Sequence, residues 1–159
     1  MRRRILFVCN GNIFRSMTAE QALRVQFPDQ FEAASAGVTA NPQEMLAPVK
    51  QRLIELGADP TSHRQRKFDQ DILDGVDLAV AINLDHQAHF KSTYGIDVPL
   101  FNRVCYDRDE GLLDIGEHFA NWQDVPDQVH AYAIEMVDRI WESMPAFAAN
   151  VDRWLPTSE

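Results

Sequence analysis

A cysteine and an arginine six positions apart lie between a short apolar run and a helical pattern near the start of the chain. The stretch reads Val8-Cys9-Asn10-Gly11-Asn12-Ile13-Phe14-Arg15-Ser16 and follows the apolar residues Ile5-Leu6-Phe7. This order predicts a buried strand, a tight loop and a helix N-terminus. Such a loop turns its backbone N–H groups toward its centre, so we expect a cradle for an anion the size of a phosphate group.

The ends of this loop carry the residue types that phosphoryl chemistry needs. A helix N-terminus beside backbone N–H groups favours negative charge, so it would stabilise a thiolate at Cys9 as well as bound phosphoryl oxygens. The guanidinium of Arg15 offers a planar pair of donors to two such oxygens. The alternative is that Cys9 is a small buried hydrophobe and Arg15 a surface charge. The agreement of strand, loop and helix signals favours the cradle.

The residues between these ends suit a tightly curled backbone. Gly11 permits a positive φ, and Asn12 tolerates the left-handed region and can hold the loop through its side-chain amide. Ser16 either caps the helix or donates a hydrogen bond to the thiolate. The predicted phosphate-binding residues are Asn10, Gly11, Asn12, Ile13, Phe14, Arg15 and Ser16.

Strand and helix patterns alternate along the rest of the chain. We expect strands over 31–36 and 77–82, an irregular strand region at 98–101 and 104–105, a loop over 107–122, and helices over 16–27, 41–57, 67–73, 84–91 and 128–150. This alternation predicts right-handed βαβ crossovers and a doubly wound α/β fold, with ligands at the carboxyl edge of a parallel sheet. The loop after Val8 lies at that edge.

Composition limits the classes of partner. With 159 residues we expect a single domain over 1–159, and a net charge of -9 disfavours nucleic acid and anionic membrane surfaces. No run approaches the roughly 18 to 20 apolar residues of a membrane span. Two cysteines argue against a disulfide framework, so we expect a cytoplasmic protein.

The stretch from Val8 to Ser16, with Ala19 and Glu20 after it, resembles the signature loop of the low-molecular-weight protein tyrosine phosphatase family. The resemblance runs over most of the chain. It implies a three-layer α/β domain with a four-stranded parallel sheet and helices on both faces, without a metal or other cofactor. It also implies that Cys9 attacks phosphotyrosine to form a phosphocysteine, which water then hydrolyses, while Arg15 clamps the phosphoryl group.

The resemblance extends to the supporting residues and to the substrate. Asn12 and Ser16 would supply hydrogen bonds that support the loop. Phe14 stands where many members carry a second cysteine that forms a protective disulfide, so that redox switch is expected to be absent; Met17 replaces a common proline. An isoleucine at the position of Ile13 goes with phosphotyrosine in this family, whereas threonine goes with phosphoarginine. The expected partner is a phosphotyrosine-containing protein or an aryl phosphate, bound by a monomer or weak dimer.

The family also uses an aspartate near its C-terminal end as acid and then base. Two candidates lie just before the last predicted helix, and neither is followed by the proline and aromatic residues that are usual in the family. Asp127 is favoured by its position, and Asp124 is the alternative. Each also has a purely structural interpretation, Asp127 as the N-cap of the last helix and Asp124 as a turn residue.

Aromatic and apolar residues near the loop suggest a pocket for a substrate ring. Ile13 and Phe14 would form one wall, and Trp122 or Tyr132 could face it, although both could equally belong to the core or the rim.

Other reactive residue types receive structural interpretations. His86 and His89 are three apart beside Asp85, but a third metal ligand at suitable spacing is missing, so a solvated helix face is expected. Cys105 is expected to pack beside the sheet. The family resemblance places His63 close to the loop, where it could buttress it.

Three functions remain open from the sequence. The favoured one is a cysteine-dependent protein tyrosine phosphatase. An arsenate reductase would need a small external thiol, because the segment 82–89 contains no relay cysteine. The third is a catalytically weak module that binds phosphorylated partners through an intact loop.

Overall fold

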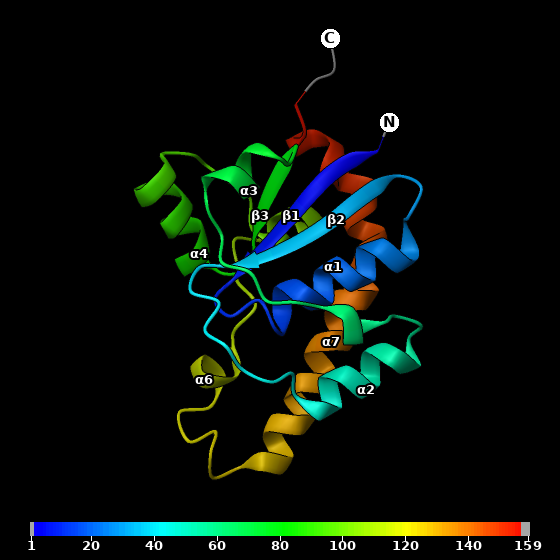
Figure 1. Cartoon of the computed structure of the whole chain (residues 1–159), viewed down its shortest axis with the longest axis vertical. Helices are drawn as coiled ribbons and strands as arrows, with labels where there is room; N and C mark the ends of the chain where they lie inside the picture. The colour runs from blue at the N-terminus through cyan, green and yellow to red at the C-terminus, as the bar shows by residue number, and fades with distance from the viewer. Residues whose placement is uncertain (1, 157–159) are drawn as a thin grey trace.

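A computed structural model describes residues 2–156 of the protein, and its centre is a parallel sheet (Figure 1). The strands are β1 (Arg3–Cys9), β2 (Phe31–Gly37) and β3 (Leu78–Ala81), in the order β2-β1-β3. Along the register, Phe7 lies between Ser35 of β2 and Val80 of β3. The predicted parallel α/β architecture is confirmed, with β1 buried at the middle of the sheet.

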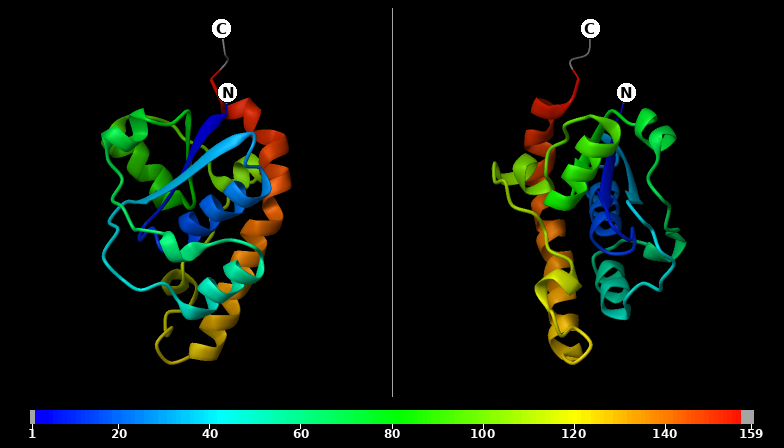
Figure 2. Two further views of the ribbon diagram at one scale, coloured as in Figure 1. Left: turned by 45° about the vertical axis from the view of Figure 1, so that its right-hand side comes forward. Right: turned by 90° about the vertical axis from the view of Figure 1, so that its left-hand side faces the viewer.

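Helices cover both faces of this sheet, in three layers (Figure 2). One face packs against α1 (Arg15–Gln26), α5 (Phe101–Tyr106) and α7 (Pro126–Asn150), and the other carries α3 (Gln70–Asp74), α4 (Leu84–His89) and the π-helical turn η2 (Phe90–Tyr94). Alternate β1 residues enter the two layers, because successive side chains of a strand point to opposite faces. Phe7 meets Phe147 at 5.3 Å between ring centroids on the first face. Leu6 and Val8 join the cluster of Phe68 and Phe90 on the second.

The prediction of a fourth strand is wrong for the described residues 2–156. The segment near 98–101 contributes only an isolated bridge between Leu100 and Ala81, in which the Ala81 N–H donates to the Pro99 carbonyl at 3.0 Å. Pro99 has no N–H for a longer ladder. The chain enters α5 at Phe101, so the predicted strand residues 104–105 are helical.

Proline also explains where two helices begin. The apolar periodicity predicts a helix from residue 41, but α2 runs only over Ala47–Glu55, with Pro48 in its first turn. A helix that continued back past Pro48 would clash with the carbonyl four residues earlier. The last helix, α7, begins at Pro126 rather than Gln128 for the same reason, since proline suits a first helical position.

The remaining elements are short. They are the 3₁₀ turns η1 (Pro60–Ser62) and η3 (Val151–Trp154) and the helix α6 (Ile115–His118), which interrupts the loop predicted over 107–122. The predicted helix over 67–73 is α3, and the Asp69 side chain caps it by accepting from the Ile72 N–H at 2.9 Å. Among the helices of residues 2–156, none is long and apolar enough to cross a membrane.

Candidate active site

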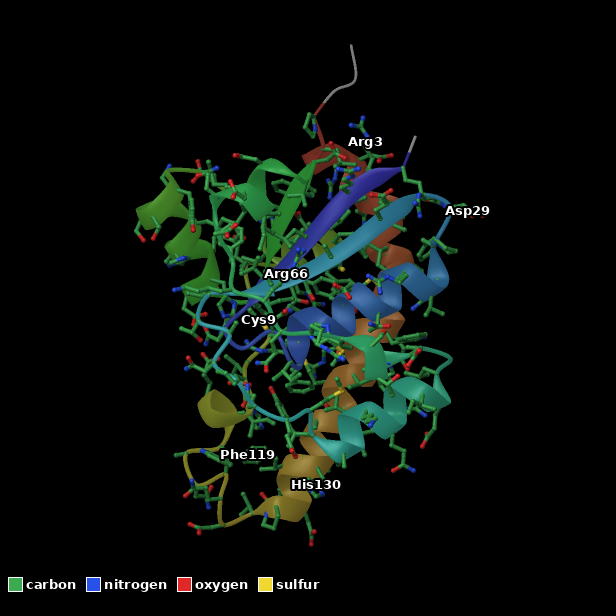
Figure 3. The ribbon with its side chains drawn as sticks, in the orientation of Figure 1. Arg3, Cys9, Asp29, Arg66, Phe119 and His130 are labelled. Atoms are coloured by element: carbon green, nitrogen blue, oxygen red, sulfur yellow. The ribbon has the colours of Figure 1, made fainter. Side chains whose placement is uncertain are left out.

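The loop between β1 and α1 surrounds Cys9 at the carboxyl edge of the sheet. Figure 3 labels Cys9 at the lower end of β1, beside the start of α1. β1 ends at Cys9 and α1 begins at Arg15, so the predicted strand, loop and helix follow one another as the sequence indicates. Cys9 is 2% exposed, and its sulfur therefore lies within the body of the protein rather than on its surface.

Asn12 is the residue that fixes the shape of this loop. Its φ of 57° is left-handed, and its side chain is fully buried. The amide nitrogen donates to the hydroxyls of Ser16 at 3.1 Å and Ser35 at 2.8 Å, while the amide oxygen accepts from the Arg66 N–H at 3.0 Å. Its carbonyl accepts from His63 Nε2 at 2.6 Å. Four hydrogen bonds, from α1, β2 and the 63–66 stretch, hold this one turn, and one of them comes from the histidine expected to buttress it.

Ser16 contacts the sulfur directly. The distance from Cys9 Sγ to Ser16 Oγ is 2.9 Å. Because Asn12 Nδ2 donates to the same hydroxyl oxygen, the hydroxyl proton is free to point at the sulfur. The helix cap lies at Phe14 and lacks a side-chain hydrogen bond. Of the two roles considered for Ser16, the hydrogen bond to Cys9 is therefore the one that the geometry supports.

Gly37 lets β2 approach the loop. A Cβ atom on Gly37 would lie 2.4 Å from the Asn10 carbonyl oxygen and 3.0 Å from the Asn12 nitrogen, closer than side chains are tolerated. The Asn10 carbonyl in turn accepts from the N–H groups of Thr39 and Ala40. The small residues at the end of β2 thus allow the close approach.

Arg15 turns its buried side chain toward the segment that follows α5. It is 2% exposed, and its Nη1 donates to the Leu112 carbonyl at 2.7 Å. The Glu117 carboxylate lies 3.8 Å from the same nitrogen. The residue expected to clamp a phosphoryl group therefore also links the loop to the 107–125 segment.

His86 corrects the expectation of a solvated helix face, since it is 1% exposed. Its Nδ1 accepts from the Asn83 N–H at 3.0 Å, so in the neutral ring Nε2 carries the proton and donates to Asn10 Oδ1 at 3.1 Å. Burial, followed by the charge of Arg15, lowers the pKa of His86 to about 4. Among residues 2–156, no three His, Cys, Asp or Glu side chains gather as metal ligands. His86 thus supports the loop from below.

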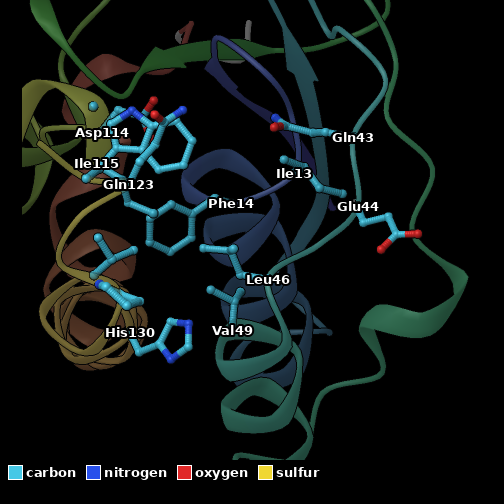
Figure 4. A pocket seen from close by; sticks show the side chains of 14 residues that line it. Ile13, Phe14, Gln43, Glu44, Leu46, Val49, Asp114, Ile115, Gln123 and His130 are labelled. Carbon is cyan, nitrogen blue, oxygen red and sulfur yellow. The ribbon is translucent and has the colours of Figure 1, made fainter.

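A cavity of about 460 Å³ opens beside the loop (Figure 4). In this view Phe14 separates the side chains of the 107–125 segment from those that precede α2. The lining residues are Ile13, Phe14, Gln43, Glu44, Leu46, Val49, Asp114, Ile115, Gly116, Trp122, Gln123, Pro126, Val129 and His130. The cavity combines an apolar wall with a few polar groups, as small-molecule sites do.

The two predicted acids do not line this cavity. Asp127 lies in the exposed first turn of α7, and Asp124 lies in the exposed turn before it. Asp114 is the aspartate in the lining, and sequence reasoning missed it because the acid was sought just before the last predicted helix, while the 107–122 stretch was expected to be a loop. The signal that could have found it is the Asp-x-x-Glu pattern of a helix start at 114–117, which places α6 inside the polar loop.

The two aromatic candidates have different surroundings. Trp122 lines the cavity and is 49% exposed, so it stands at the rim. Tyr132 lies outside the lining, where its hydroxyl donates to the Leu113 carbonyl and its ring stacks on His118 at 4.4 Å. Partial burial raises the pKa of Tyr132. Of the pair, only Trp122 is placed to meet a bound ring.

Comparisons with known proteins identify the family of this chain. The sequence profile of the low molecular weight phosphotyrosine protein phosphatases matches residues 4–153. The chain belongs to this family. The predicted family membership is confirmed, and the family is one of phosphatases.

Individual relatives carry two kinds of name. A low molecular weight protein-tyrosine-phosphatase, Ptp of Acinetobacter johnsonii, is 31% identical over 58% of this chain and 65% of its own length, so the match spans less than two thirds of that relative. PtpB of Staphylococcus epidermidis, a phosphatase of the same type, is 28% identical over 86% of this chain and 96% of its own. An arsenate reductase of Bacillus cereus is 28% identical over 80% and 89%.

Solved structures support the fold. The arginine phosphatase YwlE from Geobacillus stearothermophilus superimposes with a TM-score of 0.73 at 22% identity, covering 99% of both chains. At this identity the likeness establishes a shared architecture.

Proposed function

We propose that this member of the family is a cysteine-dependent protein tyrosine phosphatase that works through a phosphocysteine. The observation that carries the proposal is the 2.9 Å contact between Cys9 Sγ and Ser16 Oγ, which spans the loop that leads from β1 into α1. A hydroxyl that donates to the sulfur stabilises its thiolate, which is the nucleophilic form. The proposed phosphate-binding residues remain those of 10–16.

In the first step the Cys9 thiolate attacks the phosphorus atom, an S–P bond forms, and the bond from phosphorus to the phenolic oxygen breaks. Arg15 and the loop N–H groups bind the phosphoryl oxygens, as charge-assisted donors in a fixed geometry. To bind the phosphoryl group, the Arg15 guanidinium must either give up its hydrogen bond to the Leu112 carbonyl or use its other N–H donors. A carboxylic acid protonates the departing phenolate.

In the second step a water attacks the phosphocysteine. The carboxylate left by the first step takes a proton from that water, the S–P bond breaks, and inorganic phosphate leaves with Cys9 again a thiolate. One carboxyl group thus gives a proton in the first step and recovers one in the second, so the cycle needs no further proton donor.

We assign this carboxyl group to Asp114 in preference to Asp127 or Asp124. Asp114 belongs to the same cavity lining as Ile13 and Phe14, whereas the other two aspartates lie outside it. The charge of Asp114 partly opposes the lowering of the His86 pKa, and His86 hydrogen-bonds to Asn10, so the Asp114 carboxylate also lies close to the residues that support the loop. Position in the cavity comes before other criteria for a candidate acid.

The substrate class follows from the same cavity. Apolar walls from Ile13, Phe14 and Val49 and the indole of Trp122 at the rim suit an aryl group on the phosphate. The isoleucine also matches the family members that take phosphotyrosine rather than phosphoarginine. We therefore propose a phosphotyrosine-containing protein as partner of a cytoplasmic enzyme, active as a monomer or weak dimer.

Hydrolysis of p-nitrophenyl phosphate in the presence of a chelator tests the proposal. We expect turnover by the wild-type protein, none by Cys9→Ser, and a phosphorylated cysteine after rapid quenching. Asp114→Asn should slow phenyl phosphate on the order of 10²-fold, and p-nitrophenyl phosphate less, because the better leaving group needs less help from an acid. A folded wild-type protein that binds phosphate without hydrolysing either ester would instead establish the binding module.

Arsenate reduction is the second candidate, because several relatives carry that name. Cys105 is a poor relay thiol, since it is buried and burial raises its pKa to about 12. Reduction would therefore depend on a small external thiol. Arsenite production that requires glutathione and exceeds phosphotyrosine hydrolysis at equal substrate concentrations would favour this alternative.

A further inference from the structure

The Glu117 carboxylate lies where three separate parts of the site converge. Its Oε1 accepts from the Asp114 N–H at 3.0 Å, and Asn83 Nδ2 donates to Oε2 at 3.0 Å and to Oε1 at 3.3 Å. Arg15 Nη1 is 3.8 Å from Oε1. One side chain thus connects the cavity aspartate, the end of β3 and the buried arginine. The proposed chemistry gives this carboxylate no task.

Contacts at Leu112 and Leu113 anchor the segment just before Asp114, and the Leu113 carbonyl accepts from the Tyr132 hydroxyl. Leu112 donates its N–H to the Ile82 carbonyl at 3.0 Å and accepts from Arg15. Gly111 packs so closely on Asn83 that a Cβ there would lie 1.6 Å from the amide oxygen. Beyond this point Leu113 is 41% exposed, so Asp114 lies at the start of a surface stretch.

Glu117 provides an anchor on the far side of Asp114. The four-residue helix α6 is too short to hold its own position in water. The bond from the Asp114 N–H to Glu117 sets the backbone from which the aspartate side chain enters the cavity. Asn83, itself 5% exposed and next to β3, holds the Glu117 carboxylate in place.

We propose that Glu117 is a positioning residue for the general acid. The proposal rests on the assignment of Asp114 to that role in the proposed function. Glu117 acts through Asp114 and touches neither the phosphoryl group nor the leaving group. Misplacing a reacting group by about 1 Å can cost on the order of 10²-fold in rate, so an indirect residue of this kind affects turnover strongly.

A positioning role for Glu117 predicts a leaving-group dependence that a purely structural or electrostatic role of Glu117 does not predict. Loss of Glu117 leaves Cys9 and its bond to Ser16 untouched, and Arg15 keeps its shorter bond to Leu112. Phosphoryl binding is therefore retained while proton donation is impaired. The rate loss must grow as the leaving group becomes more basic. A residue that only moderated the charge of Arg15 would change all substrates and phosphate affinity alike.

The test measures kcat/KM for a series of aryl phosphates from p-nitrophenyl to phenyl phosphate. We expect Glu117→Ala to slow phenyl phosphate on the order of 10- to 100-fold and p-nitrophenyl phosphate by less than about threefold, with an unchanged inhibition constant for inorganic phosphate. Glu117→Gln keeps an oxygen that accepts from the Asp114 N–H, so it should recover most of the rate. Glu117→Asp keeps the charge but is one methylene shorter, so it should resemble alanine.

Glu110→Ala is the matched control. Glu110 is an exposed carboxylate of the same segment, and no hydrogen bond or ion pair of its side chain is seen within residues 2–156. This variant should keep the wild-type rates. Circular dichroism and thermal midpoints establish that each variant is folded.

Three results would overturn the positioning role. They are an equal loss for all leaving groups with weaker phosphate inhibition, full activity in Glu117→Asp but not in Glu117→Gln, and unchanged rates in Glu117→Ala. The proposed function fails separately, if Asp114→Asn shows no leaving-group dependence or Cys9→Ser retains activity. The two failures are therefore distinguishable.

Discussion

The loop between β1 and α1 and the 107–125 segment border the same cavity but are built in opposite ways. In the loop, Asn12 and Ser16 are fully buried and Arg15 is 2% exposed, with hydrogen bonds to neighbours from β2, α1 and the 63–66 stretch. In the segment, Leu113 is 41% and Trp122 49% exposed. The loop is part of the core, whereas the segment is a surface layer anchored at a few points.

This difference matches what each region would recognise in the proposed reaction. A phosphoryl group has a fixed shape and charge, so its site gains from donors that are rigid before binding. The leaving group differs between substrates and, in a protein substrate, is part of a polypeptide. The surface that contacts it is therefore open. Variants of the buried loop residues should therefore cost both stability and activity, while variants of exposed cavity-lining residues of the segment should affect activity more than stability.

The largest effect should come from Arg15→Lys. Lysine keeps the charge but loses the planar pair of donors and the bond that Arg15 makes to Leu112 at 2.7 Å. We expect kcat/KM for p-nitrophenyl phosphate to fall on the order of 10²- to 10³-fold. Arg108→Lys, an exposed arginine of the segment, is the control and should keep the wild-type rate. A fall of less than tenfold in Arg15→Lys would mean that the planar pair of donors of Arg15 is not needed to bind the phosphoryl group.

The second prediction concerns the pH dependence of stability. His86 is buried beneath the loop, and burial together with Arg15 lowers its pKa to about 4, while Asp85 and Asp114 oppose the shift and His89 adds to it. The unfolded chain binds the proton more readily, near pH 6.5. Stability is therefore fully present above about pH 6.5 and falls as the pH drops toward 4, by about 3 kcal/mol.

Urea unfolding between pH 7 and 4 measures this loss. His86→Gln removes the titrating ring, so its stability should fall less steeply over the same range, even if it starts lower. His130→Gln, an exposed histidine at the cavity rim, is the control and should follow the wild-type curve. Parallel curves for wild type and His86→Gln would show that other groups, chiefly carboxylates, account for the acid sensitivity.

A third prediction compares two glycines, one from each region. In Gly37→Ala the new methyl would lie 2.4 Å from the Asn10 carbonyl oxygen. Because this oxygen belongs to the backbone, the loop itself must shift to make room. We expect a loss of about 1–3 kcal/mol and lower phosphatase activity. Gly116 of α6 has open space around the position of a Cβ, so Gly116→Ala should change stability by less than about 0.5 kcal/mol. Equal losses would contradict the contrast between a rigid loop and a loosely held segment.

The loop could be predicted from the sequence because its signals are local. A strand end, a Gly-Asn turn and a helix start follow one another within Val8–Ser16, and each residue type agrees with the next. The buried apolar strands were also found, since their periodicity is local as well. The fourth predicted strand does not form, because Pro99 and the start of α5 at Phe101 end a strand pairing that the apolar pattern alone would allow.

The residues that sequence reasoning misplaced depend on distant contacts. His86 has polar neighbours along the chain, and it is buried only because α4 docks against Asn10, 76 positions away. Asp114 lies in a polar stretch without periodicity and reaches the cavity through contacts of Leu112 and Glu117 with Arg15. No local sequence pattern predicts these long-range contacts. The helix-start pattern at 114–117 could have predicted α6, but not the contacts that bring Asp114 to the cavity.

The smallest effects are expected at the two aspartates that the sequence favoured. Asp124 and Asp127 are exposed and lie outside the cavity lining, so Asp124→Asn and Asp127→Asn should each change kcat/KM for phenyl phosphate by less than about twofold. Asp127→Asn keeps a polar side chain in the first turn of α7 and loses only the attraction of its charge to the helix dipole, a few tenths of a kcal/mol.

Asp114→Asn, measured in the same assay, is the reference for a real loss of the acid. A tenfold or larger fall in either Asp124→Asn or Asp127→Asn, with Asp114→Asn near wild type, would move the acid to the start of α7. Because that helix start is exposed, such a result would require the 107–125 segment to close over the substrate during turnover. The cavity would then exist only in the open form of the site. The loop between β1 and α1 would stay fixed during turnover, and the 107–125 segment would move.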